Sequence, residues 1–248
     1  MMMNKTINKL TLSLMFLMAG SGAFAQFGKL LDKAKSAAAG NGISASPTDI
    51  ATALKQALEL GATKSADLLS AQNGFFANPS VKILFPPEAI KAEATLRKLG
   101  LNKMCDDAIL SFNRAAEDAA KTAKPIFVNA VKQMTIKDAT NILMGANDAA
   151  TTYFKNNTTD SLSKVFEPIV GNSIEKVGAT RLYSDVVERY NKVIFANKIN
   201  PDLKQYVTQK AIEGLFKQIA AEELKIRENS AFRTTDLMKK VFAQAEKK

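Results

Sequence analysis

The segment Asn73–Glu88, NGFFANPSVKILFPPE, limits the possible folds more than any other part of this sequence. Pro79, Pro86 and Pro87 exclude a continuous helix there, because proline lacks a backbone N–H and fixes φ. The segment also carries six large apolar side chains, each worth about 1.5–3 kcal/mol when fully buried. The sequence therefore predicts an extended segment that other parts of the chain cover.

Two interpretations of this segment stay open at the level of sequence. In the first, it packs across a helical body and ties the first helix to the next. In the second, it forms the lip of an apolar groove that receives a ligand or a partner peptide. The second interpretation makes Phe75, Phe76 and Phe85 candidate ligand-binding residues.

Most of the remaining chain has helical periodicity and helix-start signals. Ser46, Pro47 and Asp49 form a capping box with proline at the first helical position. Thr135 and Asp138 form a second capping box. Strand-type alternation is rare, so the predicted fold is all-α: an irregular multi-helix bundle crossed by one extended proline-bounded segment.

The patterns also predict where the other helices begin and end. A helix is expected over Pro87–Leu99, with Gly100 as its terminator, and another from Asn102, which Pro125 kinks or divides. Two more are expected at 147–157 and 159–178, the second with interruptions at Pro168 and Gly171. The remaining helices are one that starts near Thr180, one with Asn200 as its cap and Pro201 as its first residue, and a last one over 234–242.

The N-terminus has the pattern of a secretory signal peptide. Lys5 and Lys9 precede an apolar run at 10–19, and the run is followed by Ala23-Phe24-Ala25. We therefore expect residues 1–25 to be removed by cleavage between Ala25 and Gln26, which places the mature chain in the periplasm or outside the cell. No later segment approaches the roughly 20 apolar residues of a membrane span.

The mature chain is expected to have two parts. Residues 26–46 form a short amphipathic helix and a linker, and residues 47–248 form a single helical domain. The short helix is interpreted either as a loosely docked helix or as a membrane-surface attachment.

Composition excludes several classes of chemistry. The chain has no histidine and one cysteine, Cys105, so His-based nucleophile pairs, di-iron sites and zinc sites are excluded. Glycine-rich nucleotide loops are absent, and no cofactor is predicted. The net charge of +10 is mostly lysine interspersed with acids, which indicates a solvated surface rather than a nucleic-acid site. Cys105 lies in a helical pattern that predicts a buried thiol.

The arginines and two adjacent glutamates are the charged candidates for a site. The arginines considered together are Arg97, Arg114, Arg181, Arg227 and Arg233. They either pair with carboxylates such as Asp106, Asp107 and Glu117, or converge on an anionic ligand. Arg227 and Arg233 are the ligand-binding candidates.

The carboxylates also have both a structural and a functional interpretation. Glu223 and Arg227 have the spacing of a helix ion pair, while Glu222 and Glu223 together are candidate catalytic acids. Asn147 is predicted as a helix cap, with Asp148 in a ligand-binding turn as the alternative.

Several long motifs occur in one order: NGFFANPSVKILFPP, LRKLGL, VKQMTIKDATNILMGANDAATTYFKNNT, KVGATRLYSDVVERYN, YVTQKAIEGLFKQIAAEELKIREN and AFRTTDLMKKVF. Together, over Thr48–Phe242, they resemble a bacterial envelope family known as domain of unknown function 4197. The resemblance implies an exported, mainly helical protein, and it supplies no catalytic residue, ligand or partner.

The functional hypothesis is a non-catalytic binding or interaction module for an apolar or anionic ligand or partner. An envelope protein, a lipid and an anionic polymer are the candidate partners. The alternative is a carboxylate-dependent hydrolase of a cell-envelope polymer, which needs two carboxyl groups about 5–9.5 Å apart in a cleft.

Overall fold

Helices account for the architecture of the described part of this chain. The computed structural model describes residues 45–176, 178, 180, 181, 183, 184, 187, 188 and 202–245. The predicted signal peptide, its cleavage point and all but the last two residues of the 26–46 segment lie outside the described residues. No strand occurs in the described ranges, and the predicted all-α class is confirmed.

The described elements are α2 (Pro47–Ser70), the 3₁₀ turn η1 (Pro87–Ala89), α3 (Ile90–Lys98), α4 (Asn102–Ala120), α5 (Ala123–Gln133), α6 (Ile136–Leu143), α7 (Ala149–Lys176), α9 (Leu203–Glu228), the 3₁₀ turn η2 (Ser230–Phe232) and α10 (Asp236–Ala245). The described helices from η1 to α7 follow one another with short connections, whereas α2 and η1 are joined by a longer segment. The six described residues within 180–188 are helical as well.

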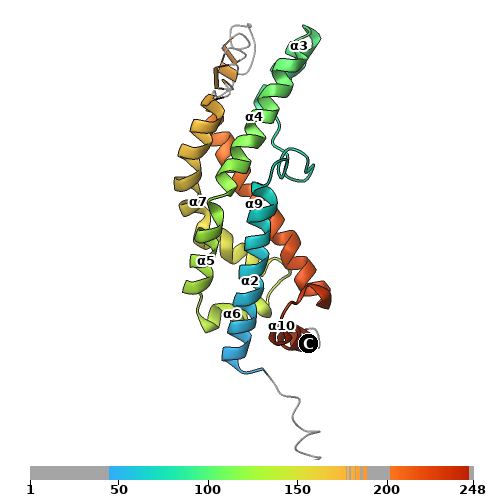
Figure 1. The fold of residues 1–248 in the computed structure, drawn as a ribbon, viewed down its shortest axis with the longest axis vertical. Helices are drawn as coiled ribbons and strands as arrows, with labels where there is room; N and C mark the ends of the chain where they lie inside the picture. The colour runs from blue at the N-terminus through green and yellow to red at the C-terminus, as the bar shows by residue number, and fades with distance from the viewer. Residues whose placement is uncertain are drawn as a thin grey trace, which may run out of the picture. The chain divides into compact units, whose positions relative to one another are not determined.

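Two helices organise the packing. Helix α9 contacts α7, α4 and α2, and helix α2 contacts α4, α5, α6, α9 and α10. Figure 1 shows α7 and α9 side by side, with α2 along another side of α9. The short helices α5 and α6 bridge α2 and α7, so most helices touch α2, α9 or both.

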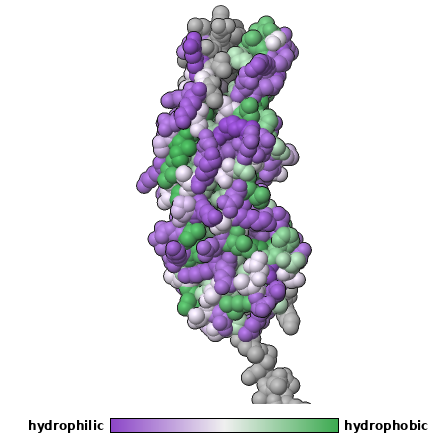
Figure 2. Space-filling view, in the orientation of Figure 1, coloured by the Kyte–Doolittle hydropathy of each residue, from purple (hydrophilic) through white to green (hydrophobic). Residues whose placement is uncertain are grey.

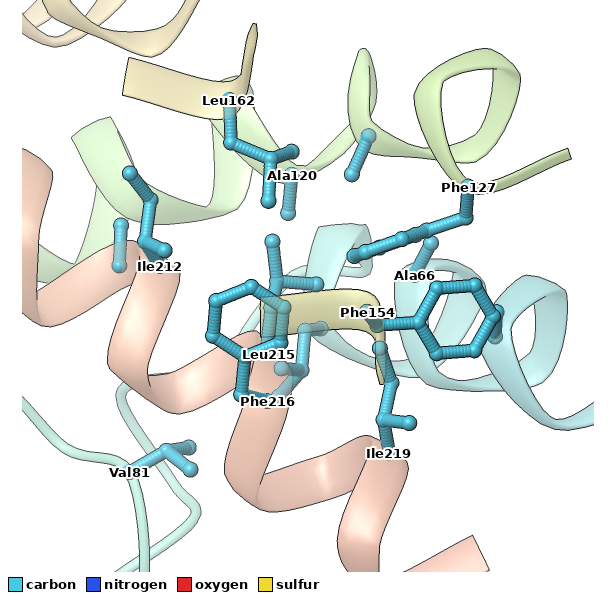
Figure 3. Close-up of a cluster of buried hydrophobic side chains, with 14 of the residues drawn as sticks. Ala66, Val81, Ala120, Phe127, Phe154, Leu162, Ile212, Leu215, Phe216 and Ile219 are labelled. Carbon is cyan, nitrogen blue, oxygen red and sulfur yellow. The ribbon is translucent and has the colours of Figure 1, made fainter. Parts of the chain in front are cut away.

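Aromatic rings from three helices meet in the core. Phe127 of α5 lies with its ring centroid 5.3 Å from that of Phe154 of α7 and 6.3 Å from that of Phe216 of α9. Figure 3 shows these side chains converging with Leu215 and Ile219 of α9. Edge-on ring contacts of this kind add specificity to apolar burial, and they fix α5, α7 and α9 against one another.

Both predicted capping boxes are present. Ser46 Oγ accepts the N–H of Asp49 at 3.1 Å, and the Asp49 carboxylate accepts the N–H of Ser46 at 3.1 Å. Thr135 and Asp138 make the same reciprocal pair at the start of α6. Gly100 follows α3 with φ of +83°, the left-handed conformation that glycine adopts without strain.

One prediction about helix boundaries was wrong, because a single helix, α7 (Ala149–Lys176), covers most of the two helices predicted at 147–157 and 159–178. Pro168 lies inside it. The helix continues because Leu162, Phe166, Val170 and Ile174 are fully or almost fully buried on both sides of the proline. Their burial outweighs the cost of about 3 kcal/mol that an interior proline imposes.

Two other helix starts also differ from prediction. Helix α9 begins at Leu203 with Asp202 as its N-cap, whose carboxylate accepts the N–H of Gln205 at 2.9 Å, rather than at Pro201 after Asn200. The predicted division near Pro125 is confirmed, but the break lies upstream of it, between Ala120 and Ala123. Pro125 occupies the first turn of α5, where a missing N–H costs nothing.

The proline-bounded segment crosses between α2 and η1. We call residues 73–86 the strap. Its first half is not extended as predicted: Asn73 has φ of +68°, and turns close from Ala77 N–H to the carbonyl of Asn73 and from Val81 N–H to that of Asn78. Residues 82–86 have no regular secondary structure. Asparagine tolerates the left-handed conformation, and this explains the compact start.

Candidate functional site

The three aromatic residues predicted as ligand-binding have different surroundings. Phe75 and Phe85 are buried in the core, and the ring of Phe85 lies 5.5 Å from that of Phe112. Phe76 is partly buried beneath the ammonium of Lys82, which lies 4.1 Å from its ring centroid. Of the three, Phe85 lines the groove described below.

The two arginines predicted as ligand-binding are adjacent and make contacts within the chain. Arg233 is 2% exposed, and it donates from Nε to the carbonyl of Ile226 at 2.9 Å and from Nη2 to that of Arg227 at 2.6 Å. Its guanidinium lies 5.4 Å from the ring centroid of Phe242. These contacts fix the link between α9 and α10, whereas the aromatic candidates belong to the strap.

Arg227 forms an ion pair with Glu223 at the junction of α6 and α7. Glu223 is buried, and its carboxylate accepts the N–H groups of Ala150 and Thr151 at 3.0 and 2.9 Å and the hydroxyl of Thr151 at 2.8 Å. Arg227 donates from Nε to Glu223 at 3.0 Å and from Nη2 to the carbonyl of Ile142 at 2.8 Å.

Glu223 therefore serves as the N-terminal cap of α7 from a distant part of the sequence. The predicted cap, Asn147, precedes the helix by two residues and is exposed. A carboxylate at a helix N-terminus binds unpaired N–H groups and interacts favourably with the helix dipole. The predicted Glu223–Arg227 ion pair is confirmed, and Asp148 is exposed.

A second buried glutamate holds the strap. Glu117 of α4 accepts the N–H groups of Phe75 and Phe76, both at 3.2 Å, and pairs with Arg114 at 2.5 Å. One turn earlier, Asn113 accepts the N–H of Ile83 at 2.9 Å and donates to its carbonyl at 2.8 Å. Sequence reasoning missed Asn113. Its position four residues after Ile109, on an apolar helix face, was the available signal.

Glu222, the residue before Glu223 on α9, has different partners. It is 2% exposed, and its carboxylate binds Lys64 at 2.8 Å and Lys225 at 2.7 Å. Burial works to raise the pKa of Glu222, but the hydrogen bonds from Lys225 and Lys64 outweigh it, so the net pKa is lowered. A carboxylate with a lowered pKa is ionised at neutral pH and is a poor general acid.

The carboxylates considered for hydrolysis are thus held by internal partners. Glu223 binds two backbone N–H groups and an arginine, and Glu222 binds two lysines. Within the described residues, no group of three or more His, Cys, Asp or Glu side chains could hold a metal ion. Cys105 is buried, and burial raises the pKa of its thiol.

A groove opens between the strap and α9, and it is the candidate functional site. Its volume is about 360 Å³, within the range of small-ligand sites. The strap contributes Ser80–Phe85, η1 contributes Pro87, and α9 contributes Tyr206, Lys210, Glu213, Gly214 and Lys217. Leu84, which is 53% exposed, is the most accessible large apolar side chain of the wall.

Gly214 lets the strap approach α9 closely. A Cβ at this position would lie 2.6 Å from Cε1 of Phe75 and 3.3 Å from Cβ of Val81. Two further contacts tie the strap to the helix: Lys217 donates to the carbonyl of Ser80 at 2.8 Å, and the Tyr206 hydroxyl donates to that of Leu84 at 3.2 Å. The groove wall is therefore fixed by its own hydrogen bonds.

The groove has a positive charge balance. Lys82, Lys210 and Lys217 line it, against the single carboxylate of Glu213, which pairs with Lys210 at 2.6 Å. Burial, followed by Glu213, raises the pKa of Tyr206, so its hydroxyl stays a neutral donor. The arrangement offers an apolar wall next to ammonium groups, which suits a molecule with an apolar body and one acidic group.

The visible surface carries few large apolar patches. Figure 2 shows a mostly hydrophilic face with small, separate hydrophobic groups. Isolated exposed apolar side chains are ordinary on globular proteins, whereas contiguous patches of several hundred Å² indicate an interface. In the described part of the chain, no helix is both long and apolar enough to cross a membrane.

Fold and site together define a helical bundle with a docked strap and a basic, partly apolar groove. The family model described as "Protein of unknown function (DUF4197)" matches residues 44–243. The chain belongs to this family, and the resemblance noted in the sequence is confirmed. No curated protein and no solved structure matches the chain.

Proposed function

We propose that this chain is an exported envelope protein that binds an amphipathic anion in the groove between the strap and α9, without catalysing a reaction. The ligand class is a molecule with an apolar body and one acidic group, as in a fatty acid. The observation that carries the proposal is the placement of exposed Leu84 beside Lys82 and Lys210 in one groove.

The contacts in the groove support this ligand class. Leu84 and Pro87 offer an apolar wall, and the aliphatic parts of the lysine side chains extend it. An acidic group placed near Lys210 would compete with Glu213 for the ammonium of this lysine, whose side chain is 40% exposed. Charge-assisted contacts of this kind give orientation, while the apolar wall gives affinity.

The N-terminal sequence supports export. Its two lysines, apolar run and Ala-Phe-Ala motif are typical of a cleaved secretory signal. We expect full-length protein expressed in a bacterium to accumulate in the periplasm with Gln26 as its first residue. Protein that stays in the cytoplasm, or that keeps residues 1–25, would contradict export.

Binding is tested with oleate as the anionic probe and oleyl alcohol as its neutral counterpart. We expect calorimetry to show oleate binding at least tenfold tighter than oleyl alcohol binding. The paired substitutions Leu84→Ser and Lys210→Gln should weaken oleate binding by tenfold or more. Native mass spectrometry of protein isolated from the periplasm should show a bound anion of this class.

Matched control substitutions lie on α6, outside the groove. Ile136 is 48% exposed, close to the exposure of Leu84, and Lys137 is exposed. The pair Ile136→Ser and Lys137→Gln should leave oleate binding unchanged. Equal loss in both pairs, equal affinity for oleate and oleyl alcohol, or no binding of oleate would overturn the proposed site.

A further inference from the structure

The turn between α3 and α4 exposes two leucines on either side of one glycine. Leu99 is 70% exposed, the highest value for a large apolar side chain among the described residues, and Leu101 is 41% exposed. Single exposed leucines are ordinary on a globular protein, but here two of them flank Gly100. We call residues 98–103, with the sequence KLGLNK, the tip.

Helix α3 carries the tip away from the core. The main contacts of α3 are with α4 and η1, and Ala92 is its only buried residue. Figure 1 shows α3 and the start of α4 at the upper end of the view, away from α5, α6 and α10. A Cβ added at Gly100 would meet no atom within 4 Å. The tip is therefore open to an external partner.

The backbone of the turn is already hydrogen-bonded. The N–H groups of Leu99, Gly100 and Leu101 donate to carbonyls in the last turn of α3 at 3.0 to 3.1 Å. Unpaired N–H groups make it costly to move a chain segment out of water. Because these three donors are paired, the two leucines can enter an apolar layer without that cost.

Lysines border the two leucines on both sides. Lys98 and Lys103 are exposed, and no acidic residue lies between them in the sequence. Lys103 pairs with Asp107 at 2.6 Å, but its side chain is 87% exposed, and such exposed ion pairs are weak. A lysine can lay its aliphatic stem along an apolar layer while its ammonium stays at a polar surface.

Two of the nearby acidic residues are held behind the tip by an arginine. Arg97 pairs with Glu93 and with Asp106, each at 2.9 Å. The first turn of α4 contains no acidic residue, so the positive end of the helix dipole adds to the charge of the lysines. Apolar side chains bordered by cations match a surface that has anionic groups above a hydrocarbon layer.

We propose that the tip inserts into the surface of a bilayer that contains anionic phospholipids. Leu99 and Leu101 enter the upper part of the acyl-chain layer, and Lys98 and Lys103 lie among the headgroup phosphates. The attachment is peripheral, because two side chains enter the bilayer while α3 and α4 stay outside it. The contact does not use the strap groove, so it does not depend on the anion proposed there.

Insertion is tested with a fluorescent variant of the mature chain. The chain contains no tryptophan, so Leu99→Trp adds a single indole at the tip. Vesicles of phosphatidylglycerol and phosphatidylethanolamine should shift its emission to shorter wavelength, and brominated acyl chains should quench it. Ile136→Trp is the control, at a position of α6 that is 48% exposed, and it should show neither change.

Affinity is measured by co-sedimentation with the same vesicles. The paired substitutions Leu99→Ser and Leu101→Ser should lower the partition coefficient by about tenfold or more, because two apolar side chains no longer leave water. The matched pair is Ile136→Ser and Met144→Ser, at positions that are 48% and 47% exposed. This control pair should bind vesicles like the native chain.

The contribution of charge is tested in the same way. Lys98→Gln with Lys103→Gln should weaken binding to the anionic vesicles by about tenfold and change binding to phosphatidylcholine vesicles much less. Lys132→Gln with Lys137→Gln alters the net charge equally at exposed positions outside the tip, and it should have little effect.

Three results would each overturn the proposal. They are absence of vesicle binding by the native chain, an unshifted emission of Leu99→Trp when the chain sediments with vesicles, and equal losses for the tip leucines and the α6 pair. A dimer that forms without lipid and dissociates in the leucine variant would assign the tip to a second copy of the chain instead. Variants of Leu84 and Lys210 should bind vesicles normally, so failure of the anion site is distinguishable from failure of this one.

Discussion

Two buried glutamates, Glu223 and Glu117, use the same arrangement in different surroundings. Each accepts two successive backbone N–H groups from a distant segment and pairs with an arginine about one turn away on its own helix. Glu223 anchors the start of a long helix, and Glu117 anchors the turns of the strap. The two arrangements differ in how much water can reach the arginine of each ion pair.

Arg227 has little access to water, whereas Arg114 has more. The side chain of Arg227 is 12% exposed and also binds the carbonyls of Ile142 and Leu143, while that of Arg114 is 33% exposed and reaches Asn73. Removal of Glu223 would leave a nearly buried charge, and removal of Glu117 would leave one that water can solvate. Loss of Glu223 should therefore lower the free energy of unfolding more than loss of Glu117.

The largest effect is expected for Glu223→Ala. Loss of one partner of a buried ion pair costs about 3–5 kcal/mol, and here the N–H groups of Ala150 and Thr151 also lose their acceptor. Urea denaturation at pH 7 should show this decrease in the free energy of unfolding. Glu59→Ala, at an exposed position of α2, is the control and should change stability by less than about 0.5 kcal/mol. A similar small change for Glu223→Ala would refute its role as a cap.

Glu117→Ala should have a smaller effect, about 2–3 kcal/mol, because Arg114 can turn toward solvent. Hydrogen exchange should locate the change: the amides of Phe75 and Phe76 should exchange faster, while those of Ala150 and Thr151 keep their protection. If Glu117→Ala destabilised the chain more than Glu223→Ala, the comparison of the two arginines would be wrong.

Gly214→Ala should cost about 1–3 kcal/mol, because the added Cβ meets the buried ring of Phe75 and the core has no room for it. Gly171→Ala is the control. Its Cβ would meet the side chain of Lys204 at 3.1 Å, and that flexible chain can move. Thermal unfolding of the two variants should therefore differ, with Gly171→Ala close to the native chain. Equal behaviour would mean that the strap adapts.

Thr135→Ala shows how much a cap within one helical turn stabilises the chain, for comparison with the buried glutamates Glu223 and Glu117, which bind N–H groups of distant segments. The threonine closes the capping box of α6, and its loss should cost about 1 kcal/mol. Urea denaturation gives the value. Because Thr135 is exposed and its partner Asp138 lies in the same turn, a cost as large as that of Glu223→Ala would contradict the distinction between local and long-range caps.

The smallest effect concerns pH and Glu222. Its folded-state pKa is lowered from the ordinary value of 4.5, so its contribution to stability is present above that value and is lost as the pH falls through the folded pKa. Glu222→Gln should flatten the decline in stability below about pH 4.5. Unfolding by urea between pH 7 and pH 3 tests this. Glu59→Gln should leave the decline unchanged.

Much of the fold could be predicted because its signals are local. The capping boxes at Ser46 and Thr135, the glycine after α3 and the ion pair between Glu223 and Arg227 depend on residues a few positions apart. A wrong prediction arose where a local signal pointed to a break, as with the interruption predicted at Pro168, which lies inside the continuous helix α7. There, burial of one continuous apolar face decided the outcome.

The site was less predictable than the fold. The apolar, proline-bounded segment correctly drew attention to the strap, and Phe85 does line the groove. The lysines and the tyrosine that complete the groove come from α9, more than a hundred residues later in the chain.

By itself, the sequence determined the helices, their local caps and the class of protein, because helical periodicity and capping depend on neighbours within one or two turns. Only the tertiary structure decided which carboxylate caps α7, how the strap lies on α4 and α9, and where grooves open. Those outcomes depend on contacts between distant residues, such as Glu223 with Ala150 and Asn113 with Ile83. Such contacts form only when whole faces of helices are buried against one another.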